Sequence, residues 1–150
     1  MQHGEAKTED EDPTRPLTDD GRAEVERVAR LASRLRLGIV AVAHSGKTRA
    51  RETAEIVVAA LQPAPALREL AGLGPNDDPA AVARAVEPAG ETWLLVGHLP
   101  HLCRLASLLL VGDPDRTVIA FRMGGLVALA REGTRWHLRW ILTPEIAAAG

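Results

Sequence analysis

The run IVAVA at residues 39–43 is short, uninterrupted and apolar, and it contains β-branched side chains. Such a run is typical of a strand that is buried on both faces, as the inner strands of a parallel sheet are. The polar residues HSGKTR at 44–49 follow directly, and apolar residues at helical spacing come next. A strand, a polar turn and a helix in this order predict an α/β fold with its ligand site where the strand ends.

The rest of the chain alternates between helical and strand patterns in the same way. Helical spacing predicts helices at about 18–36, from a cap at Ser45 to Pro63, at about 79–87 and from Pro100 onward. Apolar runs predict further strands at 93–97, 117–121, 126–130 and 136–142, the last two as a hairpin-like pair. We therefore expect residues 1–150 to form a single three-layer α/β/α domain with a largely parallel sheet.

Composition excludes several classes of partner and cofactor. The formal net charge is -2 and the pI is about 6.2, so nothing in the bulk charge favours nucleic acid or an anionic membrane. Cys103 is the only cysteine, which excludes an internal disulfide and any multi-cysteine metal site. The sequence contains no apolar stretch of about 18 residues. We expect a cytoplasmic protein without a cofactor.

Three polar segments are predicted to lie at one edge of the sheet. They are Gln2-His3-Gly4-Glu5 near the N-terminus, residues 44–49 after the first apolar run, and Gly97-His98-Leu99-Pro100-His101 after the run at 93–97. Each alone is a weak signal, but the carboxyl ends of parallel strands share an edge, where helix N-termini attract anions. A nucleotide-binding loop is excluded, because its first glycine would stand where Ala41 does.

The order of these motifs resembles that of a known family. QHGEA at 2–6, RPLTDDG at 15–21, the pattern S-x-x-x-R-A-x-x-T at 45–53 and GHLP at 97–100 are similar to the SixA-type phosphohistidine phosphatases, a branch of the histidine phosphatase superfamily. The resemblance spans most of the chain. It implies a phosphoglycerate mutase-like fold and a phosphatase that works without a metal through a phosphohistidine enzyme intermediate. Its substrate would be protein phosphohistidine or a small phosphorylated compound.

The resemblance also implies roles for individual residues. By position, His3 matches the nucleophile, Arg49 the phosphate clamp and His98 the second pocket histidine. We expect Gln2, Arg15, Arg49 and His98 to bind the phosphate. For the proton donor, Asp77 is the first candidate and Glu69 the second.

Chemistry supports the same roles independently. A neutral imidazole is a nucleophile near pH 7, so histidine can take up a phosphoryl group and pass it to water. An arginine presents a fork of donors that matches two phosphate oxygens. A phosphohistidine substrate has an imidazole leaving group, which needs less help from an acid than an alkoxide does.

The chain departs from the family pattern in two places. Gln2 stands where the superfamily has an arginine, so one positive charge is missing, and Arg15 is a candidate to supply it. Only Met1 and Gln2 precede His3, whereas the family has an apolar strand there, so the first strand looks truncated. We hypothesise that translation starts upstream of Met1 or that the gene product is truncated.

Two other functions fit the sequence. A catalytically silent relative would bind a phosphorylated protein or a small phosphate without hydrolysing it, which the uncharged Gln2 favours. A metal-dependent hydrolase would use His3, His44, His98 and His101, since the last two are three residues apart.

Overall fold

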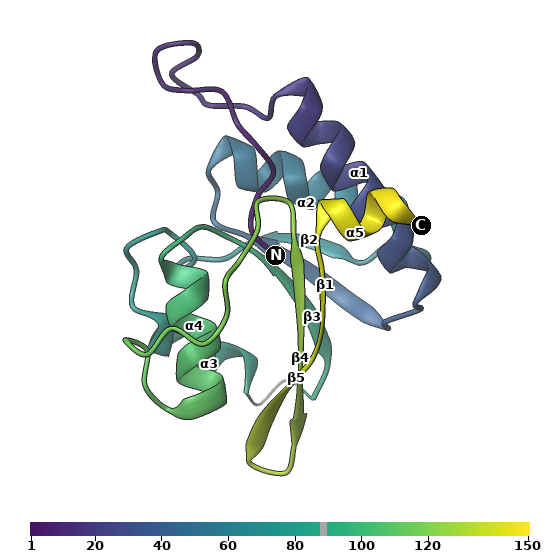
Figure 1. Ribbon diagram of the computed structural model, residues 1–150. Helices are drawn as coiled ribbons and strands as arrows, with labels where there is room; N and C mark the ends of the chain where they lie inside the picture. Colours follow the sequence, from purple (N-terminus) through teal and green to yellow (C-terminus); the bar gives the residue numbers. More distant parts are fainter. Residues whose placement is uncertain (88–89) are drawn as a thin grey trace.

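The computed structural model of the protein describes residues 1–87 and 90–150 (Figure 1). Its helices are α1 (Asp19–Arg34), α2 (Thr48–Ala60), α3 (Pro79–Val86), α4 (His101–Val111) and α5 (Pro144–Ala149). Its strands are β1 (Ile39–His44), β2 (Ala66–Glu69), β3 (Thr92–Val96), β4 (Leu126–Glu132) and β5 (Arg135–Leu142).

The strands of the described residues form two sheets. β1 lies between β2 and β3 in a parallel three-stranded sheet, and β4 pairs with β5 in an antiparallel hairpin. The extreme N-terminus lies beside β3, where Gln2 makes a parallel bridge with Gly97. The mixed α/β fold with a parallel sheet and a terminal hairpin confirms the fold expected from the sequence.

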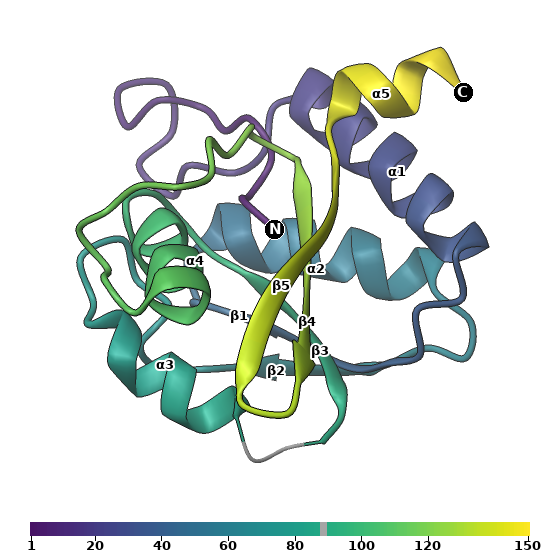
Figure 2. The same ribbon diagram turned by 60° about the horizontal axis from the view of Figure 1, so that its bottom comes forward.

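Helices cover both faces of the sheet. α1, α2 and α5 lie on one side, and α3 and α4 lie on the other (Figures 1 and 2). Neighbouring residues of β1 contribute to different cores, because side chains alternate along a strand: Val42 packs with α1 and α2, and Ala43 packs with α3 and α4. Burial on both faces holds for the second half of β1 only, since Val40 is exposed.

Helix α1 follows the sequence signals closely. The side chain of Thr18 accepts a hydrogen bond from the Gly21 amide, and Asp19 and Asp20 lie at the positive end of the helix. Val25 and Val28 face the core and are almost fully buried. No helix in the described ranges is both long and apolar enough to cross a membrane.

Four details of the secondary structure differ from the prediction. Residues 117–121 are not a strand, and only Ile119 of this run is buried, against α4. β2 and α5 were not expected from the sequence. Helix α2 begins at Thr48 after Lys47, so Ser45 does not cap it; the Ser45 hydroxyl lies against His98 instead.

Candidate active site

His3 is held in one orientation by hydrogen bonds. Its backbone amide donates to the carbonyl of Gly97 at 3.1 Å, which fixes the residue at the end of β3. Its ring Nδ1 donates to the carbonyl of Gly4 at 2.7 Å, so the proton lies on Nδ1 and the lone pair on Nε2. The residue is buried. The reactive nitrogen of His3 is therefore defined by the backbone around it.

Arg49 lies in the first turn of α2 and faces His3. Its Nε donates to Nε2 of His3 at 3.3 Å. Fully buried Thr53, one turn further along α2, accepts a hydrogen bond from the Gly4 amide at 3.1 Å and donates to the carbonyl of Arg49 at 2.7 Å. Thr53 thus joins the two segments that carry His3 and Arg49.

His98 lies in the loop between β3 and α4. The centroids of its ring and the His3 ring are 4.9 Å apart. Its Nε2 is 2.6 Å from the hydroxyl oxygen of Ser45, which follows β1. Its Nδ1 is buried and has no hydrogen-bond partner within residues 1–87 and 90–150. Three segments far apart in sequence therefore bring two histidines and an arginine together.

The segment after His3 packs closely against the start of α1. A Cβ atom on Gly4 would come within 2.7 Å of a methyl group of Val25, and a Cβ on Gly21 would come within 2.2 Å of the carbonyl oxygen of Glu5. Only glycine fits at either position without displacing the neighbouring segment. The two glycines let the chain after His3 cross directly over the start of α1.

The surroundings keep both histidines uncharged at neutral pH. Burial lowers the pKa of His3, and the positive charges of Arg49 and Arg15 lower it further, while the bond to Gly4 acts in the opposite direction. Burial lowers the pKa of His98 to about 3, with contributions from His3, Arg49 and Lys47. A neutral His3 with a lone pair on Nε2 can act as a nucleophile.

The other two predicted phosphate ligands lie close by. Gln2 is buried next to His3, and its side-chain oxygen has no hydrogen-bond partner among the residues described. Half-buried Arg15 donates from Nε to the carbonyl of Lys7 at 3.1 Å, and its charge lowers the pKa of both His3 and Arg49. The site therefore carries a positive field without a formal charge at Gln2.

Neither candidate for the proton donor bonds to this cluster. The Asp77 carboxylate accepts a hydrogen bond from the Gly74 amide at 2.8 Å. Burial lowers the pKa of His101, and the negative charge of Asp77 acts in the opposite direction. The Glu69 carboxylate lies beside Gly46, where an added Cβ would meet it at 2.6 Å. In the described part of the chain no hydrogen bond joins either carboxylate to His3, Arg49 or His98. The assignment of Asp77 or Glu69 stays a prediction.

The four histidines proposed as metal ligands do not form a ligand set. Among the residues placed in the structure, no three His, Cys, Asp or Glu side chains are grouped as a metal site would require. Nδ1 of His44 accepts a hydrogen bond from the Gly46 amide at 3.1 Å. His101 is fully buried, and within the same residues its ring nitrogens have no partner.

Sequence reasoning missed three residues around the cluster. Ser45 contacts His98, Thr53 joins Gly4 to Arg49, and the charge of Lys47 contributes to the low pKa of His98. Ser45 and Thr53 are the fixed outer letters of the pattern S-x-x-x-R-A-x-x-T, and Thr53 lies four residues after Arg49, hence on the same face of the helix. The spacing within this pattern was the sequence signal that could have placed Ser45 and Thr53 at the site.

We expect the free energy of unfolding to decrease as the pH falls below 6.5. The pKa of His98 is about 3 in the folded protein against 6.5 when unfolded, so the unfolded chain binds more protons in this range. Above pH 6.5 this group does not reduce the free energy of unfolding. Between pH 6.5 and pH 5 it lowers the free energy of unfolding by on the order of 1 kcal/mol per pH unit. Urea titrations at several pH values measure it.

The matched control for this prediction is His98→Asn. Since this variant lacks the titrating ring, its stability should vary less steeply between pH 6.5 and 5 than that of the wild type. Identical slopes for the two proteins would contradict the assignment. In both proteins the lowered pKa of His3 also makes the free energy of unfolding decrease as the pH falls.

Comparisons with known proteins were consistent with this geometry. The sequence model of the histidine phosphatase superfamily (branch 1) matches residues 1–74, which include His3 and Arg49. No curated protein matches the sequence. The sequence therefore matches the model of this family, and its fold is compared with solved structures.

Several solved structures share the fold over nearly the whole chain. The protein histidine phosphatase SixA, solved in complex with tungstate, is 27% identical, with a TM-score of 0.81 over 96% of this chain and 94% of that one. An Agrobacterium tumefaciens protein assigned as the phosphohistidine phosphatase SixA is 23% identical, with a TM-score of 0.77 and coverage of 95% and 94%. The alpha-ribazole phosphatase from Shigella flexneri is 14% identical, with a TM-score of 0.77 and coverage of 96% and 95%. Residues 1–74 therefore match the histidine phosphatase superfamily (branch 1), and nearly the whole chain is similar to the solved protein histidine phosphatase SixA.

Proposed function

We propose that this protein is a metal-independent phosphatase that hydrolyses phosphohistidine through a phosphoryl group carried on His3. The observation that carries the proposal is the orientation of His3: Nδ1 donates to Gly4, and Nε2 faces the guanidinium of Arg49. A lone pair and a fork of cationic donors thus converge on the same space. This is the arrangement that in-line attack on a phosphoryl group requires.

The first step transfers the phosphoryl group to the enzyme. The lone pair of His3 Nε2 attacks phosphorus, a new P–N bond forms, and the P–N bond of the substrate breaks. The substrate imidazole leaves with the electron pair of that bond and takes a proton from solvent. Arg49 binds the phosphoryl oxygens as their charge shifts, and Arg15 and Lys47 add positive potential.

The second step returns the enzyme to its starting state. Water attacks phosphorus, the bond to Nε2 breaks, and the electron pair returns to the His3 ring while inorganic phosphate leaves. His98 is neutral in the free protein because its pKa is about 3. A phosphate dianion beside it stabilises the imidazolium, so its pKa rises on binding and the ring becomes a donor to the phosphate.

The choice of phosphohistidine as substrate follows from the leaving group. In the described residues no hydrogen bond holds Asp77 or Glu69 against the cluster, so the proposal favours a substrate whose leaving group needs little help from an acid. An imidazole leaves more easily. The solved protein histidine phosphatase SixA, 27% identical, supports this choice, and its tungstate is a tetrahedral oxyanion like phosphate. The alpha-ribazole phosphatase that shares the fold makes small phosphomonoesters the second candidate class of substrate.

Gln2 favours one alternative, a protein that binds phosphorylated ligands without turnover. Its side chain is neutral where the family motif has arginine, and its oxygen finds no partner in the described part of the chain. Replacing a charged donor by a neutral one costs about 1–2 kcal/mol, or about ten-fold in rate. This cost slows a phosphatase but does not abolish it, so catalysis is the better-supported function.

The proposal is tested by measuring kcat/KM for two substrates, each with and without a metal chelator. We expect kcat/KM for a phosphohistidine-containing protein to exceed that for glycerol phosphate, whose leaving group is an alkoxide, by about a hundred-fold, equivalent to about 2.7 kcal/mol. An excess of EDTA should change neither rate. Binding of phosphohistidine protein without release of phosphate would identify a silent relative. Loss of activity in EDTA that is restored by a divalent metal would contradict the metal-independent mechanism.

A further inference from the structure

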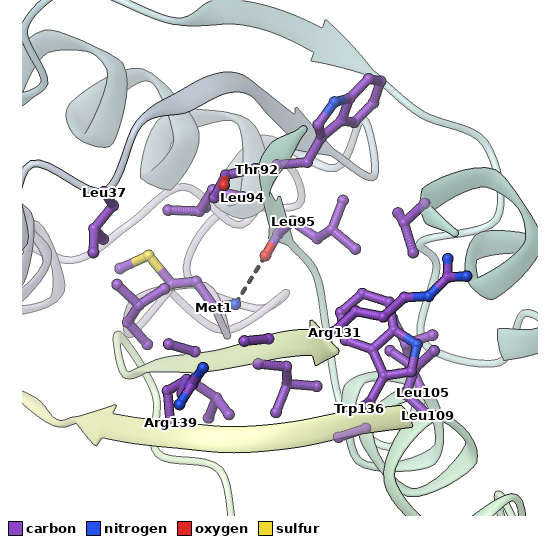
Figure 3. A pocket seen from close by; sticks show the side chains of 18 of the residues that line it. Met1, Leu37, Thr92, Leu94, Leu95, Leu105, Leu109, Arg131, Trp136 and Arg139 are labelled. Carbon is purple, nitrogen blue, oxygen red and sulfur yellow. Dashed lines mark hydrogen bonds between the residues drawn. The ribbon is translucent and has the colours of Figure 1, made fainter. Parts of the chain in front are cut away.

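A cavity in the structure is lined by residues other than the cluster of His3, Arg49 and His98. It measures about 680 Å³ and lies between β3 and the β4–β5 hairpin (Figure 3). Most of its lining is apolar, and none of the three cluster residues is part of it. Among the polar groups without an assigned role, the hydroxyl of Ser45 contacts the cluster directly.

The fold places Ser45 beside the loop that carries His98. His44, the last residue of β1, lies opposite Val96, the last residue of β3. Ser45 and the segment of His98 therefore leave the sheet side by side, because β1 and β3 are parallel neighbours. The amide of Lys47 also donates to the Ser45 oxygen at 3.4 Å. The position of the hydroxyl is thus set by its own turn as well as by His98.

The ring of His98 contacts Ser45 through one nitrogen. Its Nε2 is 2.6 Å from the Ser45 oxygen, and its Nδ1 is buried without a partner within residues 1–87 and 90–150. His98 is only 2% exposed, whereas Ser45 is half-buried. A phosphate that approaches His98 from the solvent side therefore meets Nε2 and the Ser45 hydroxyl together.

The direction of this hydrogen bond depends on the charge of the ring. A hydroxyl has one hydrogen and two lone pairs, and one lone pair accepts from the Lys47 amide. Beside a neutral imidazole the hydroxyl can donate to Nε2 or accept from it, according to the tautomer. Beside an imidazolium it can only accept, because both ring nitrogens then carry hydrogen. Protonation of His98 therefore frees the hydrogen of the Ser45 hydroxyl.

The charge of His98 is one that a bound phosphate can change. Burial lowers its pKa to about 3, and its neighbours act in the same direction, namely His3, Arg49, Lys47 and His101. The ring is therefore neutral in the free protein. A phosphate dianion beside it favours the imidazolium, so the ring gains a proton as the phosphate binds.

We propose that Ser45 is a further phosphate ligand whose hydroxyl is released for binding by His98. As phosphate binds, His98 takes up a proton from solvent, and its Nε2–H donates to the Ser45 oxygen as well as to the phosphate. The hydrogen of Ser45 then turns from the ring to a phosphoryl oxygen. The proposal rests on the phosphate site of the proposed function, but it does not depend on turnover.

Binding of tungstate to the whole chain tests the proposal. Tungstate is a dianion that the protein cannot hydrolyse, and it is bound in the solved SixA structure. Isothermal titration calorimetry in buffers of different ionisation enthalpy gives the Kd and the number of protons taken up. Ser45→Ala should bind tungstate at least about ten-fold more weakly than the wild type. Ser45→Thr keeps the hydroxyl and should bind within about three-fold of the wild type.

Proton uptake separates this role of Ser45 from a structural one. The wild type should take up about one proton for each tungstate bound, and the uptake should decrease as the pH rises above the pKa of His98 in the complex. In Ser45→Ala the pH of half-maximal uptake should be lower by about one unit, because Nε2–H has lost an acceptor. A structural change alone would weaken binding by the same factor at every pH.

Ser33→Ala is the matched control for these measurements. The hydroxyl of Ser33 donates to the carbonyl of Arg30 at 2.8 Å within α1, so this variant should bind tungstate like the wild type. The proposal would be overturned by an affinity of Ser45→Ala within about two-fold of the wild type, by an unshifted midpoint of proton uptake, or by equal weakening in Ser45→Ala and Ser45→Thr. Failure of the proposed function alone would appear as the expected tungstate binding without release of phosphate from phosphohistidine.

Discussion

We expect the His3→Asn variant to lose at least about 10³-fold in kcat/KM toward phosphohistidine while it keeps its fold. Asparagine retains a polar group near the carbonyl of Gly4, where His3 Nδ1 donates now, but it offers no ring nitrogen to attack phosphorus. Loss of the nucleophile removes both chemical steps, because the covalent intermediate can no longer form. Steady-state phosphate release measures the effect, and circular dichroism verifies the fold.

Trapping of the intermediate makes this prediction specific. Wild-type protein quenched during turnover of a labelled phosphodonor should carry an acid-labile, alkali-stable phosphoryl group, and His3→Asn should carry none. The matched control is His137→Asn, because His137 is exposed on β5, remote in sequence from all three site segments. It should label like the wild type. Equal labelling of wild type and His3→Asn would show that another residue is the nucleophile.

The parts of the fold that the sequence predicts well are those with strong local signals. α1 was predicted to within two residues because Thr18 offers a cap and apolar residues recur at helical spacing over about three turns. β1 was predicted because apolar, β-branched runs are rare outside buried strands. In both cases one stretch of sequence contains the whole signal.

β2 was missed because its stability comes from outside its own sequence. Residues 66–69 are ALRE, all four are exposed, and they follow Pro63 and Pro65. They form a strand because the edge of β1 offers backbone partners, with Ala66 opposite Ala41. The opposite error occurred at 117–121, where β-branched residues predict a strand but the structure provides no neighbouring ladder within the described residues.

The grouping of His3, Arg49 and His98 could be predicted, whereas their contacts could not. Each follows a chain segment that ends at the same edge of the sheet, so topology alone brings them together. The bond from Ser45 to His98 and the link through Thr53 depend on side-chain geometry, which no spacing rule supplies. The tautomer of His3 likewise depends on one carbonyl, that of Gly4.

Arg49→Ala should lower kcat/KM by about 10³-fold, and Arg49→Lys should lower it by an intermediate factor. Lysine restores the charge but not the planar fork that can bind two phosphoryl oxygens at once, so the difference between the two variants separates geometry from charge. Arg51→Ala is the matched control: Arg51 lies on the same helix, is exposed and pairs with Glu55 at 3.7 Å. Its kcat/KM should stay within about two-fold of the wild type.

The pH profile distinguishes a direct role of Arg49 from a purely structural one. The charge of Arg49 lowers the pKa of His3, so its removal raises that pKa and decreases the fraction of neutral imidazole at a given pH. The acidic limb of the kcat/KM profile should therefore shift to higher pH in Arg49→Ala and stay nearly unchanged in Arg49→Lys. A mere loss of packing would lower the rate equally at every pH. An unshifted profile in Arg49→Ala would show that Arg49 does not act on His3 through its charge.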